Sequence, residues 1–551
     1  DSAGIAFLEN NEIIIKKEVG RISNLEKLIN DEKSYVSIGH TRWATHGKPT
    51  KINAHPHSQG NITLVHNGII ENFMEIKNEL LNNGCIFVSD TDTEVAGAYI
   101  NYLYSQNKNM IRTLSEASKK FLGSYSFGII NSNEPDKIYA IRKDSPLIVG
   151  IGSGENFIAS DVPSILKYTN KYIDLDNDEI ICLSNSEVVV YNNKCKKVNK
   201  NILTFDGESN LVEKNGYETY MLKEMHEEAD IIKRTCENEI NFDLSKYDSI
   251  HIVACGSAYH AGLVGARAIE ELVNIKVNVE IASEYQYKKH FYNNKTLVIA
   301  ISQSGETADT KKCVNLANES GIDTLGIVNV KGSSIARICK NVIYTLAGPE
   351  IAVATTKAYL SQVTTLILLA IKNSNTIVSK EEINMLPYYI ENLVNKNYED
   401  LAVKLYRKED IYFIGRGVDY AIAMEGSLKL KEISYIHSEA YPAGELKHGT
   451  ISLINDGTPV VAIATDKDLY LKTISNAKEV NARGAYTILV TNKEVENDGV
   501  YSELILIPKV NPILEPILTI VPLQMLAYEI AKLRGNDIDK PKNLAKSVTV
   551  E

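Results

Sequence analysis

The stretch Thr296-Leu-Val-Ile-Ala-Ile-Ser-Gln-Ser-Gly-Glu-Thr307 decides the fold of the larger part of the chain. Its first six residues form a short apolar run that is typical of a buried strand. The polar residues 302–307 that follow predict a loop, and a helix is expected to begin near Ala308. Further buried strands, each followed by a helix, are predicted at Ile250–Ala254 and Leu325–Val328. This alternation predicts a parallel sheet that is covered by helices on both faces.

The same order of strands occurs a second time along the chain. Ile411–Gly417 lies 161 residues after the similar segment Ile250–Gly256. Two further strands, at 460–463 and 488–490, each lie 162 residues after their counterparts at 298–301 and 326–328. A nearly constant spacing of three matched segments predicts a duplicated α/β unit.

Residues 302–307 are a candidate phosphate-binding loop. In an open parallel sheet, ligands bind beyond the carboxyl ends of the strands, and the start of the next helix offers backbone amides and a partial positive charge. The alternative is an ordinary Ser/Thr helix cap with a turn glycine. Three hydroxyls, Gly305 and the position at the strand end together favour phosphate. The matching segment of the second copy, Ala464–Leu469, lacks the glycine and most hydroxyls and has gained two acidic residues, so one phosphate site per chain is expected.

A candidate catalytic face lies in the second copy. Glu425, Lys429 and Glu432 are spaced i, i+4 and i+7 at the expected start of a helix, so they share one helix face. An aldose–ketose isomerisation needs a base that moves a proton between neighbouring carbons and an acid that opens the sugar ring. Glu432 is the candidate base and His448 the candidate acid. The alternative is a solvated ladder of Glu and Lys, which the apolar Ile433 and the glycine-rich segment 444–449 make less favourable.

The first third of the chain has a different pattern. Up to about Leu211 the sequence predicts an α+β layer structure of short strands and turns with two helices. Asn61–His66 reads as a strand, followed by an Asn67-Gly68 turn and a helix over 71–82. The polar segment 206–217 reads as a linker, and Tyr220–Cys236 as one amphipathic helix.

Composition narrows the class of protein. A chain of 551 residues is too long for one hydrophobic core. A net charge of −11 without a long Lys/Arg run argues against binding to nucleic acid. The seven cysteines are scattered without a CxxC pair, which is typical of reduced thiols, and no metal is expected. The longest apolar runs, such as Leu366–Ile371, are too short to span a membrane, and a cytoplasmic location is expected.

Long motifs throughout the chain resemble the family of isomerizing glutamine–fructose-6-phosphate aminotransferases, or glucosamine-6-phosphate synthases. They are HTRWATHG at 40–47, NAHPH at 53–57, HNGII at 66–70, TDTE at 91–94, SQSGETAD at 302–309, KLKEISY at 429–435, GELKHG at 444–449 and NLAKSVTVE at 543–551. This family makes glucosamine 6-phosphate and glutamate from fructose 6-phosphate and glutamine, the first step of hexosamine and UDP-N-acetylglucosamine synthesis, and needs no cofactor.

The resemblance implies an α+β glutaminase domain with an N-terminal nucleophile, followed by two α/β sugar isomerase (SIS) domains with parallel sheets. The expected boundaries are 1–211 for the type 2 glutamine amidotransferase domain, 212–240 for a linker and first helix, 241–380 and 400–541 for the SIS domains, and 542–551 for the tail.

The resemblance also implies a glutamine site. Arg42 and Asp92 would hold the carboxylate and the amino group of glutamine. The Asn67 side chain and the Gly68 amide would form an oxyanion hole, and Trp43 would gate an ammonia tunnel. The implied set of glutamine-site residues is Arg42, His46, His55, Asn67, Gly68 and Asp92.

On the sugar side, Lys546 would form a Schiff base with the open-chain ketose. Glu432 would move a proton from C1 to C2, Lys429 would stabilise charge, and Glu425 completes the implied catalytic set. His448 would come from the partner subunit, so a homodimer is implied. The implied sugar-phosphate site comprises Ser257, Ser302, Gln303, Ser304, Thr307, Val353 and Ala545.

The sequence departs from the family pattern at two places. The family nucleophile is an N-terminal Cys whose own α-amine acts as the base, and none of the seven cysteines matches it. Because Asp1–Gly4 resembles a stretch some tens of residues inside the family proteins, the start is expected to be missing and glutamine hydrolysis to fail. Ala258 stands where the family has a serine, so phosphate binding is expected to be weaker at most.

Two other functions fit parts of the sequence. A sugar-phosphate-sensing regulator would carry an inactive glutaminase half, but the presence of Glu432, His448 and Lys546 argues against it. An amidotransferase of the phosphoribosyl type would need a pyrophosphate-binding sugar domain, which the duplicated pattern does not offer.

Overall fold

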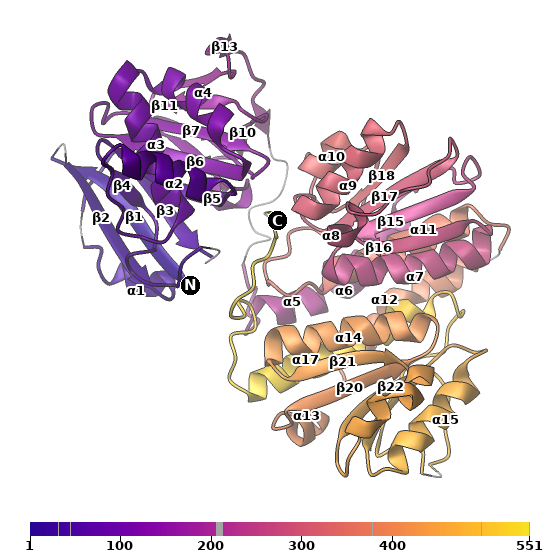
Figure 1. Ribbon diagram of the computed structural model, residues 1–551. Helices are drawn as coiled ribbons and strands as arrows, with labels where there is room; N and C mark the ends of the chain where they lie inside the picture. The colour runs from indigo at the N-terminus through magenta and orange to yellow at the C-terminus, as the bar shows by residue number, and fades with distance from the viewer. Residues whose placement is uncertain are drawn as a thin grey trace. The chain divides into compact units, whose positions relative to one another are not determined.

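The computed structural model describes residues 1–10, 12–30, 32–43, 46–204, 213–376, 378–497 and 499–549. The chain forms two compact units, one within residues 1–204 and one within 213–548. Each unit is described by itself below (Figure 1). The domain boundary expected at 211–212 and the first part of the expected linker lie outside the described residues.

The first unit consists of antiparallel sheets and helices. Its sheets have the strand orders β2-β1-β3, β14-β10-β8-β9 and β13-β12-β11-β7-β6-β5-β4. The strands are β1 (Ser2–Glu9), β2 (Glu12–Val19), β3 (Ser37–Arg42), β4 (His57–Gln59), β5 (Ile62–Ile70), β6 (Gly123–Asn131), β7 (Ile138–Lys143), β8 (Ile148–Ile151), β9 (Asn156–Ala159), β10 (Lys171–Asp174), β11 (Ile180–Leu183), β12 (Val188–Tyr191), β13 (Lys197–Val198) and β14 (Leu203–Thr204). The helices are α1 (Ile22–Glu26), α2 (Phe73–Asn82), α3 (Asp92–Asn107) and α4 (Met110–Lys120).

Two local predictions for this unit are wrong. The described residues contain four helices rather than two. The Asn67-Gly68 pair is not a turn but lies inside β5, where the two residues pair with Ser126 and Tyr125 of β6. Gly68 has a φ of +142°, and a Cβ there would overlap the carbonyl oxygen of Ser124. The glycine is therefore required by the close approach of two strands, which overrides the local preference of Asn-Gly for a hairpin.

The second unit contains two parallel five-stranded sheets with the same topology, which confirms the predicted α/β duplication. The strand orders are β16-β15-β17-β18-β19 and β21-β20-β22-β23-β24. The strands are β15 (Ser249–Ala254), β16 (Lys276–Ile281), β17 (Thr296–Ser302), β18 (Asp323–Val328), β19 (Asn341–Tyr344), β20 (Asp410–Gly415), β21 (His437–Pro442), β22 (Pro459–Ala464), β23 (Tyr486–Thr491) and β24 (Glu503–Leu506).

Helices cover both sheets and join them into one core. α7 (Gly256–Val273) packs on α11 (Lys357–Lys372) and on α14 (Val418–Ser434), which in turn packs on α17 (Val521–Leu533) (Figure 1). Buried apolar residues from both copies form one continuous cluster. The remaining helices are α5 (Tyr220–His226), α6 (Glu228–Glu237), α8 (Ala282–Tyr285), α9 (Ala308–Glu319), α10 (Ser334–Ile338), α12 (Lys380–Val394), α13 (Glu399–Leu405), α15 (Tyr470–Asn481) and α16 (Glu515–Thr519).

The predicted single helix at Tyr220–Cys236 is divided into α5 and α6 at Glu227. The two helices differ in the elements that they contact. The amides of Tyr220 and Met221 donate to the Asp539 carboxylate at 2.9 and 3.0 Å, and α5 packs on α17 and α12, whereas α6 packs on α11 and α12.

One helical stretch, Glu515–Leu533, has the length and hydropathy of a membrane span. Its most apolar window is 83% buried inside the protein, which is the position of a core helix.

Candidate functional site

The predicted loop lies between β17 and α9, as expected. Its own hydroxyls form hydrogen bonds within the loop. The Gly305 amide donates to Ser302 Oγ at 3.0 Å, and the Glu306 amide donates to Ser304 Oγ at 3.1 Å. Ser302 Oγ also lies 2.9 Å from Thr307 Oγ1. Gly305 has a φ of +68°, and a Cβ there would overlap the hydroxyl of Ser333. Hydroxyls and backbone thus gather at the start of α9, where an anion is favoured.

In the second copy, the Asp419 carboxylate accepts hydrogen bonds from the loop after β22. The corresponding loop of the first copy is the predicted phosphate loop. The amides of Thr465 and Asp466 donate to Asp419 at 2.8 and 3.1 Å, and the Thr465 hydroxyl donates to it at 2.5 Å. Asp419 is fully buried on the first turn of α14, and burial raises its pKa to about 6. At the repeat spacing of 161, its counterpart in the first copy is Ala258. The first copy therefore lacks this carboxylate, which supports one phosphate site per chain.

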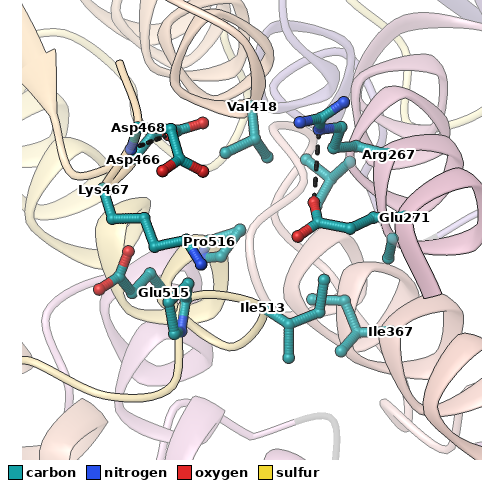
Figure 2. Close-up of a pocket in the computed structure, with 13 residues that line it drawn as sticks. Arg267, Glu271, Ile367, Val418, Asp466, Lys467, Asp468, Ile513, Glu515 and Pro516 are labelled. Carbon is teal, nitrogen blue, oxygen red and sulfur yellow. Dashed lines mark hydrogen bonds and ion pairs between the residues drawn. The ribbon is translucent and has the colours of Figure 1, made fainter. Parts of the chain in front are cut away.

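A hollow of about 520 Å³, including its open side, lies beside the loop of the second copy (Figure 2). Asp466, Lys467 and Glu515 line one side, and Arg267, 3.6 Å from Glu271, lies on the other. Burial and the nearby acidic groups Asp419 and Asp466 raise the pKa of Glu515 to about 7. Surroundings with this many carboxyls disfavour a phosphate, so the hollow is distinct from the predicted sugar-phosphate site.

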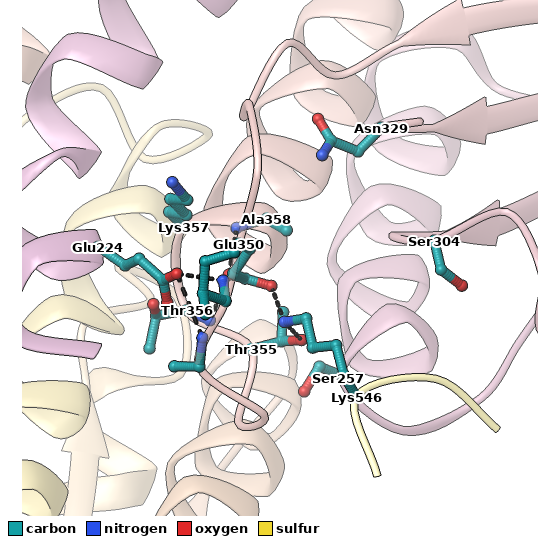
Figure 3. A network of polar contacts seen from close by, with 12 residues as sticks. Glu224, Ser257, Ser304, Asn329, Glu350, Thr355, Thr356, Lys357, Ala358 and Lys546 are labelled. Atoms are coloured by element: carbon teal, nitrogen blue, oxygen red, sulfur yellow. Dashed lines mark hydrogen bonds and ion pairs between the residues drawn. The ribbon is translucent and has the colours of Figure 1, made fainter. Parts of the chain in front are cut away.

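The C-terminal tail lies along the predicted phosphate loop. Ser547 Oγ is 2.9 Å from Ser304 Oγ, and the Ala308 amide donates to the Val548 carbonyl at 3.2 Å. The preceding residue is Lys546, whose Nζ lies 2.5 Å from Glu350 Oε2 and 3.4 Å from Thr355 Oγ1 (Figure 3). The structure therefore brings the predicted Schiff-base lysine and the phosphate loop together.

Three other residues of the predicted sugar site belong to the tail, to the segment that follows Glu350 and to the loop itself. Ala545 is partly buried next to Lys546. The amide of Val353 donates to the Asp539 carbonyl at 3.0 Å, which ties the loop that carries Glu350 to the chain ahead of the tail. The carbonyl of Gln303 accepts the amide of Asn329 at 3.3 Å.

The predicted catalytic face of α14 is buried, so the solvated-ladder alternative is excluded. Lys429 Nζ lies 2.5 Å from Glu432 Oε2 and 3.5 Å from Glu425 Oε1. The side chains of Glu425 and Lys429 are fully buried, whereas that of Glu432 is 20% exposed. Burial alone would lower the pKa of Lys429, but the charges of Glu432 and Glu425 outweigh it and raise the pKa. These residues do not open the helix as expected, because α14 already begins at Val418.

Glu425 links the catalytic face to the first copy. Ser257 Oγ donates to Glu425 Oε1 at 2.8 Å, and His260 Nδ1 lies 2.7 Å from Glu425 Oε2. Both partners lie on α7, so the site is built across the two copies. His448, in contrast, is exposed at the end of the 3-10 helix η3 (Ala443–His448).

Sequence reasoning missed Glu350, Glu224, Thr355 and His260. Glu350 and Glu224 are isolated acidic residues without a local motif, and their contacts join positions 196 and 127 residues apart. The sequence held a signal only for His260. It follows Ser257 by three residues, so the two residues lie on the same face of a helix.

In the first unit, the predicted glutamine-site residues lie at the ends of strands and helices. Arg42 is buried at the end of β3, and its guanidinium donates to the carbonyls of His46 and Gly47, the latter at 3.0 Å. Burial lowers the pKa of Arg42. Asp92 is the first residue of α3 and accepts the Ile70 amide at 2.9 Å, where the helix start favours its charge.

A cluster of neutral histidines adjoins these residues. The His40 and His55 rings lie against each other, tilted by 34° with centroids 4.5 Å apart, and Thr93 Oγ1 lies 3.0 Å from both His55 Nε2 and His66 Nδ1. Burial lowers the pKa of His40 and of His57 to about 3 and that of His55 well below its usual value. His55 is therefore a buried neutral group. Elsewhere in the unit, the predicted gate Trp43 is 44% exposed, and the Asn67 carbonyl accepts the Ser126 hydroxyl at 3.5 Å.

Comparison with known protein families covers both units. The glutamine amidotransferase domain family matches residues 40–167, and the SIS domain family matches residues 243–372 and 404–534. The C-terminal domain of glucosamine-fructose-6-phosphate aminotransferase from Francisella tularensis is 36% identical, with a TM-score of 0.55 over 60% of this chain and 100% of that chain. Glucosamine-6-phosphate deaminase from Thermotoga maritima is 25% identical, with a TM-score of 0.51 over 60% of this chain and 99% of that chain.

Relatives of similar length match the whole chain. Glutamine–fructose-6-phosphate aminotransferase (isomerizing) from Caldanaerobacter subterraneus subsp. tengcongensis is 46% identical over 583 residues, which covers 100% of this chain and 95% of the relative. The protein of the same name from Clostridium tetani is 45% identical over 581 residues, with the same coverage. The chain therefore belongs to the family of isomerizing glutamine–fructose-6-phosphate aminotransferases.

Proposed function

We propose that this protein converts fructose 6-phosphate and glutamine into glucosamine 6-phosphate and glutamate. The observation that carries the proposal is the position of Lys546. Its neighbour Ser547 contacts Ser304 of the phosphate loop, and its own amine lies between the Glu350 carboxylate and the Thr355 hydroxyl. An amine held next to a phosphate loop suits a sugar phosphate that carries a carbonyl group.

The sugar phosphate binds with its phosphate at Ser302, Gln303, Ser304 and Thr307. Lys546 attacks C2 of the open-chain ketose and forms an imine with release of water. Ammonia then replaces the lysine at C2. Movement of a proton from C1 to C2 leaves an aldehyde at C1 and an amine at C2, which is glucosamine 6-phosphate.

Glu432 is the base for this proton transfer. The ammonium of Lys429, 2.5 Å away, stabilises negative charge in the surroundings of the reacting carbons. Glu425 holds Lys429 from the other side and is itself fixed by Ser257 and His260. This buried arrangement keeps the base oriented, because each member has a charged partner.

Where the N-terminal Cys of the family pattern is present, ammonia comes from glutamine, which Arg42 and Asp92 hold by its two charged ends. Asn67 and Gly68 stabilise the tetrahedral intermediate, and Trp43 gates the passage of ammonia. His448 opens the sugar ring from the partner subunit, which its exposed position permits, so the active protein is a homodimer. A cytoplasmic location accords with seven free cysteines.

The test supplies fructose 6-phosphate with ammonium and measures hexosamine phosphate by chromatography. Ammonium bypasses glutamine hydrolysis, so the assay reports on the second unit alone. Lys546→Arg should abolish product, whereas Lys540→Arg, at an exposed lysine just ahead of the tail, should leave it unchanged. Absence of product from the unaltered protein would contradict the proposal and favour a sugar-phosphate-binding regulator.

A further inference from the structure

A buried carboxylate, Glu350, holds the amine of Lys546. The chain positions the carboxylate firmly, since its Oε1 accepts the amides of Thr356 and Ala358 at 3.0 and 3.1 Å. These amides belong to the start of α11, where the helix dipole favours negative charge. Its other oxygen, Oε2, faces Lys546 Nζ at 2.5 Å (Figure 3). The Glu350 side chain is fully buried and that of Lys546 is 24% exposed, so the pair points from the interior toward the site.

A second carboxyl, Glu224 of α5, fixes the same loop from behind. It accepts the amides of Ile351 and Ala352, the latter at 3.3 Å. Burial, and next the charge of Glu350, raise the pKa of Glu224 to about 8. Burial alone would raise the pKa of Glu350 as well, but the Lys546 ammonium and the hydrogen bonds to the carboxylate lower it. At neutral pH, Glu224 is therefore protonated and Glu350 carries the charge.

Titratable groups from four helices and the tail surround Glu350. Lys546 comes from the tail and Glu224 from α5. Glu228 of α6 is fully buried, and burial raises its pKa well above the usual range. Lys357 of α11 is paired with Glu227 at 2.6 Å, and Lys429 of α14 with Glu432. Lys546 is thus the cation that Glu350 contacts directly, while the neighbouring lysines have other partners.

We propose that Glu350 is the catalytic base that takes the proton from the Lys546 ammonium before the amine attacks the ketose, and that it returns this proton to the leaving hydroxyl. This inference rests on the proposed function. A lysine ammonium has no lone pair and cannot attack a carbonyl, and lysine side chains stay protonated near neutral pH. A base in contact with Nζ removes this obstacle.

The step balances in atoms and charge. Proton transfer gives a neutral amine and a neutral Glu350 carboxyl. The amine adds to C2, and the carbinolamine passes its extra proton from nitrogen to oxygen. Glu350 then protonates the C2 hydroxyl, which leaves as water, and the products are a protonated imine and the Glu350 carboxylate. The site therefore begins and ends with one buried anion beside one cation.

The experiment traps this imine with cyanoborohydride in the presence of fructose 6-phosphate and follows the gain in intact mass over pH 6.5–8.5. The unaltered protein should trap at a rate that changes little with pH. Glu350→Gln should slow trapping by about 10²-fold at pH 7, within the usual range for a general base. Its residual rate should rise by about tenfold per pH unit, because solvent must now deprotonate the lysine.

Matched controls separate this role from others. Glu228→Gln makes the same substitution at a buried carboxyl and should trap at the rate of the unaltered protein. Binding of glucitol 6-phosphate, which has no carbonyl, should be equal in all variants and reports folding. If Glu350→Gln does not bind it, Glu350→Asp keeps the buried charge but retracts it from Nζ, and should slow trapping.

Two results would overturn the assignment while leaving the proposed function intact. One is a Glu350→Gln or Glu350→Asp variant that traps like the unaltered protein, and the other is an equal loss in Glu228→Gln. If the unaltered protein itself gives no mass gain, the Schiff-base role of Lys546 fails, and the assignment of Glu350 fails with it.

Discussion

Replacing Ala258 with Asp should block the proposed phosphate site of the first copy with a carboxylate of the protein itself. In the second copy, Asp419 occupies the equivalent position and accepts the amides of Thr465 and Asp466. The residues that correspond to these two at the repeat spacing of 162 are Gln303 and Ser304 of the phosphate loop. A carboxylate at position 258 should therefore take up the same amides and repel a phosphate that approaches them.

The size of the effect follows from these contacts. A hydrogen bond to a charged group contributes about 1.5–3 kcal/mol. Loss of two such bonds to the substrate phosphate amounts to about 3–6 kcal/mol, or roughly 10²–10⁴-fold in affinity. Burial raises the pKa of Asp419 to about 6, and a carboxyl introduced in place of Ala258 should behave alike. The effect of the substitution should therefore be larger at pH 8 than at pH 5.5.

Calorimetry with glucitol 6-phosphate measures this loss directly. Ala258→Asn has the same shape without the charge, so it should weaken binding far less, and its loss of affinity relative to the unaltered protein should be the same at both pH values. An Ala258→Asp variant that binds within threefold of the unaltered protein, at both pH values, would refute the idea that an internal carboxylate replaces the phosphate in the second copy.

Three further changes test other parts of the second unit. Gly305→Ala should cost about 1–2 kcal/mol of unfolding free energy, because Gly305 has a φ of +68°. The substitution should also abolish binding of glucitol 6-phosphate, since a Cβ at this position overlaps Ser333. Unchanged affinity in calorimetry would contradict this. Lys429→Met should lower the unfolding free energy in urea by about 3–5 kcal/mol, because it leaves the fully buried Glu425 and the partly exposed Glu432 without their cation. Lys431→Met, at an exposed position of the same helix, should change it by less than about 0.5 kcal/mol. Glu224 binds its proton more tightly in the folded state, with a pKa of about 8, than in the unfolded state, so its contribution to stability is complete below about pH 4 and is lost as pH rises to about 8. Urea unfolding between pH 5 and 8 should show this fall, and Glu224→Gln should flatten it; an equal slope in the variant would rule out Glu224 as its source.

The sheets of the second unit were predictable because buried parallel strands are short, continuous apolar runs. The three matched segments of each copy are strands with bounds close to those predicted, and their constant spacing alone indicates one topology used twice. The loop at 302–307 was predictable for the same reason, since its place follows from the strand that it ends.

Contacts between distant segments could not be predicted in this way. Glu350 and Glu224 become important only when loop, helix and tail meet, and no local pattern distinguishes them from surface acids. Local rules also failed where packing overrides them. Asn67-Gly68 has a hairpin signature, but the approach of β6 makes it part of a strand. Conversely, spacing correctly put Glu425, Lys429 and Glu432 on one face, yet only the packed structure shows that this face is buried.

The position of the tail on the phosphate loop has a consequence for substrate choice. Ser547 contacts the loop and Lys546 carries the amine, so two neighbouring residues set the separation between an anchored phosphate and the carbon that is attacked. Consecutive Cα atoms are about 3.8 Å apart, so the distance between the backbones of these two residues is fixed. Under the proposed roles, a sugar phosphate whose carbonyl lies one carbon nearer to or farther from its phosphate still fits the loop but presents the wrong atom to the amine. Selection among phosphorylated sugars then acts on turnover rather than on binding.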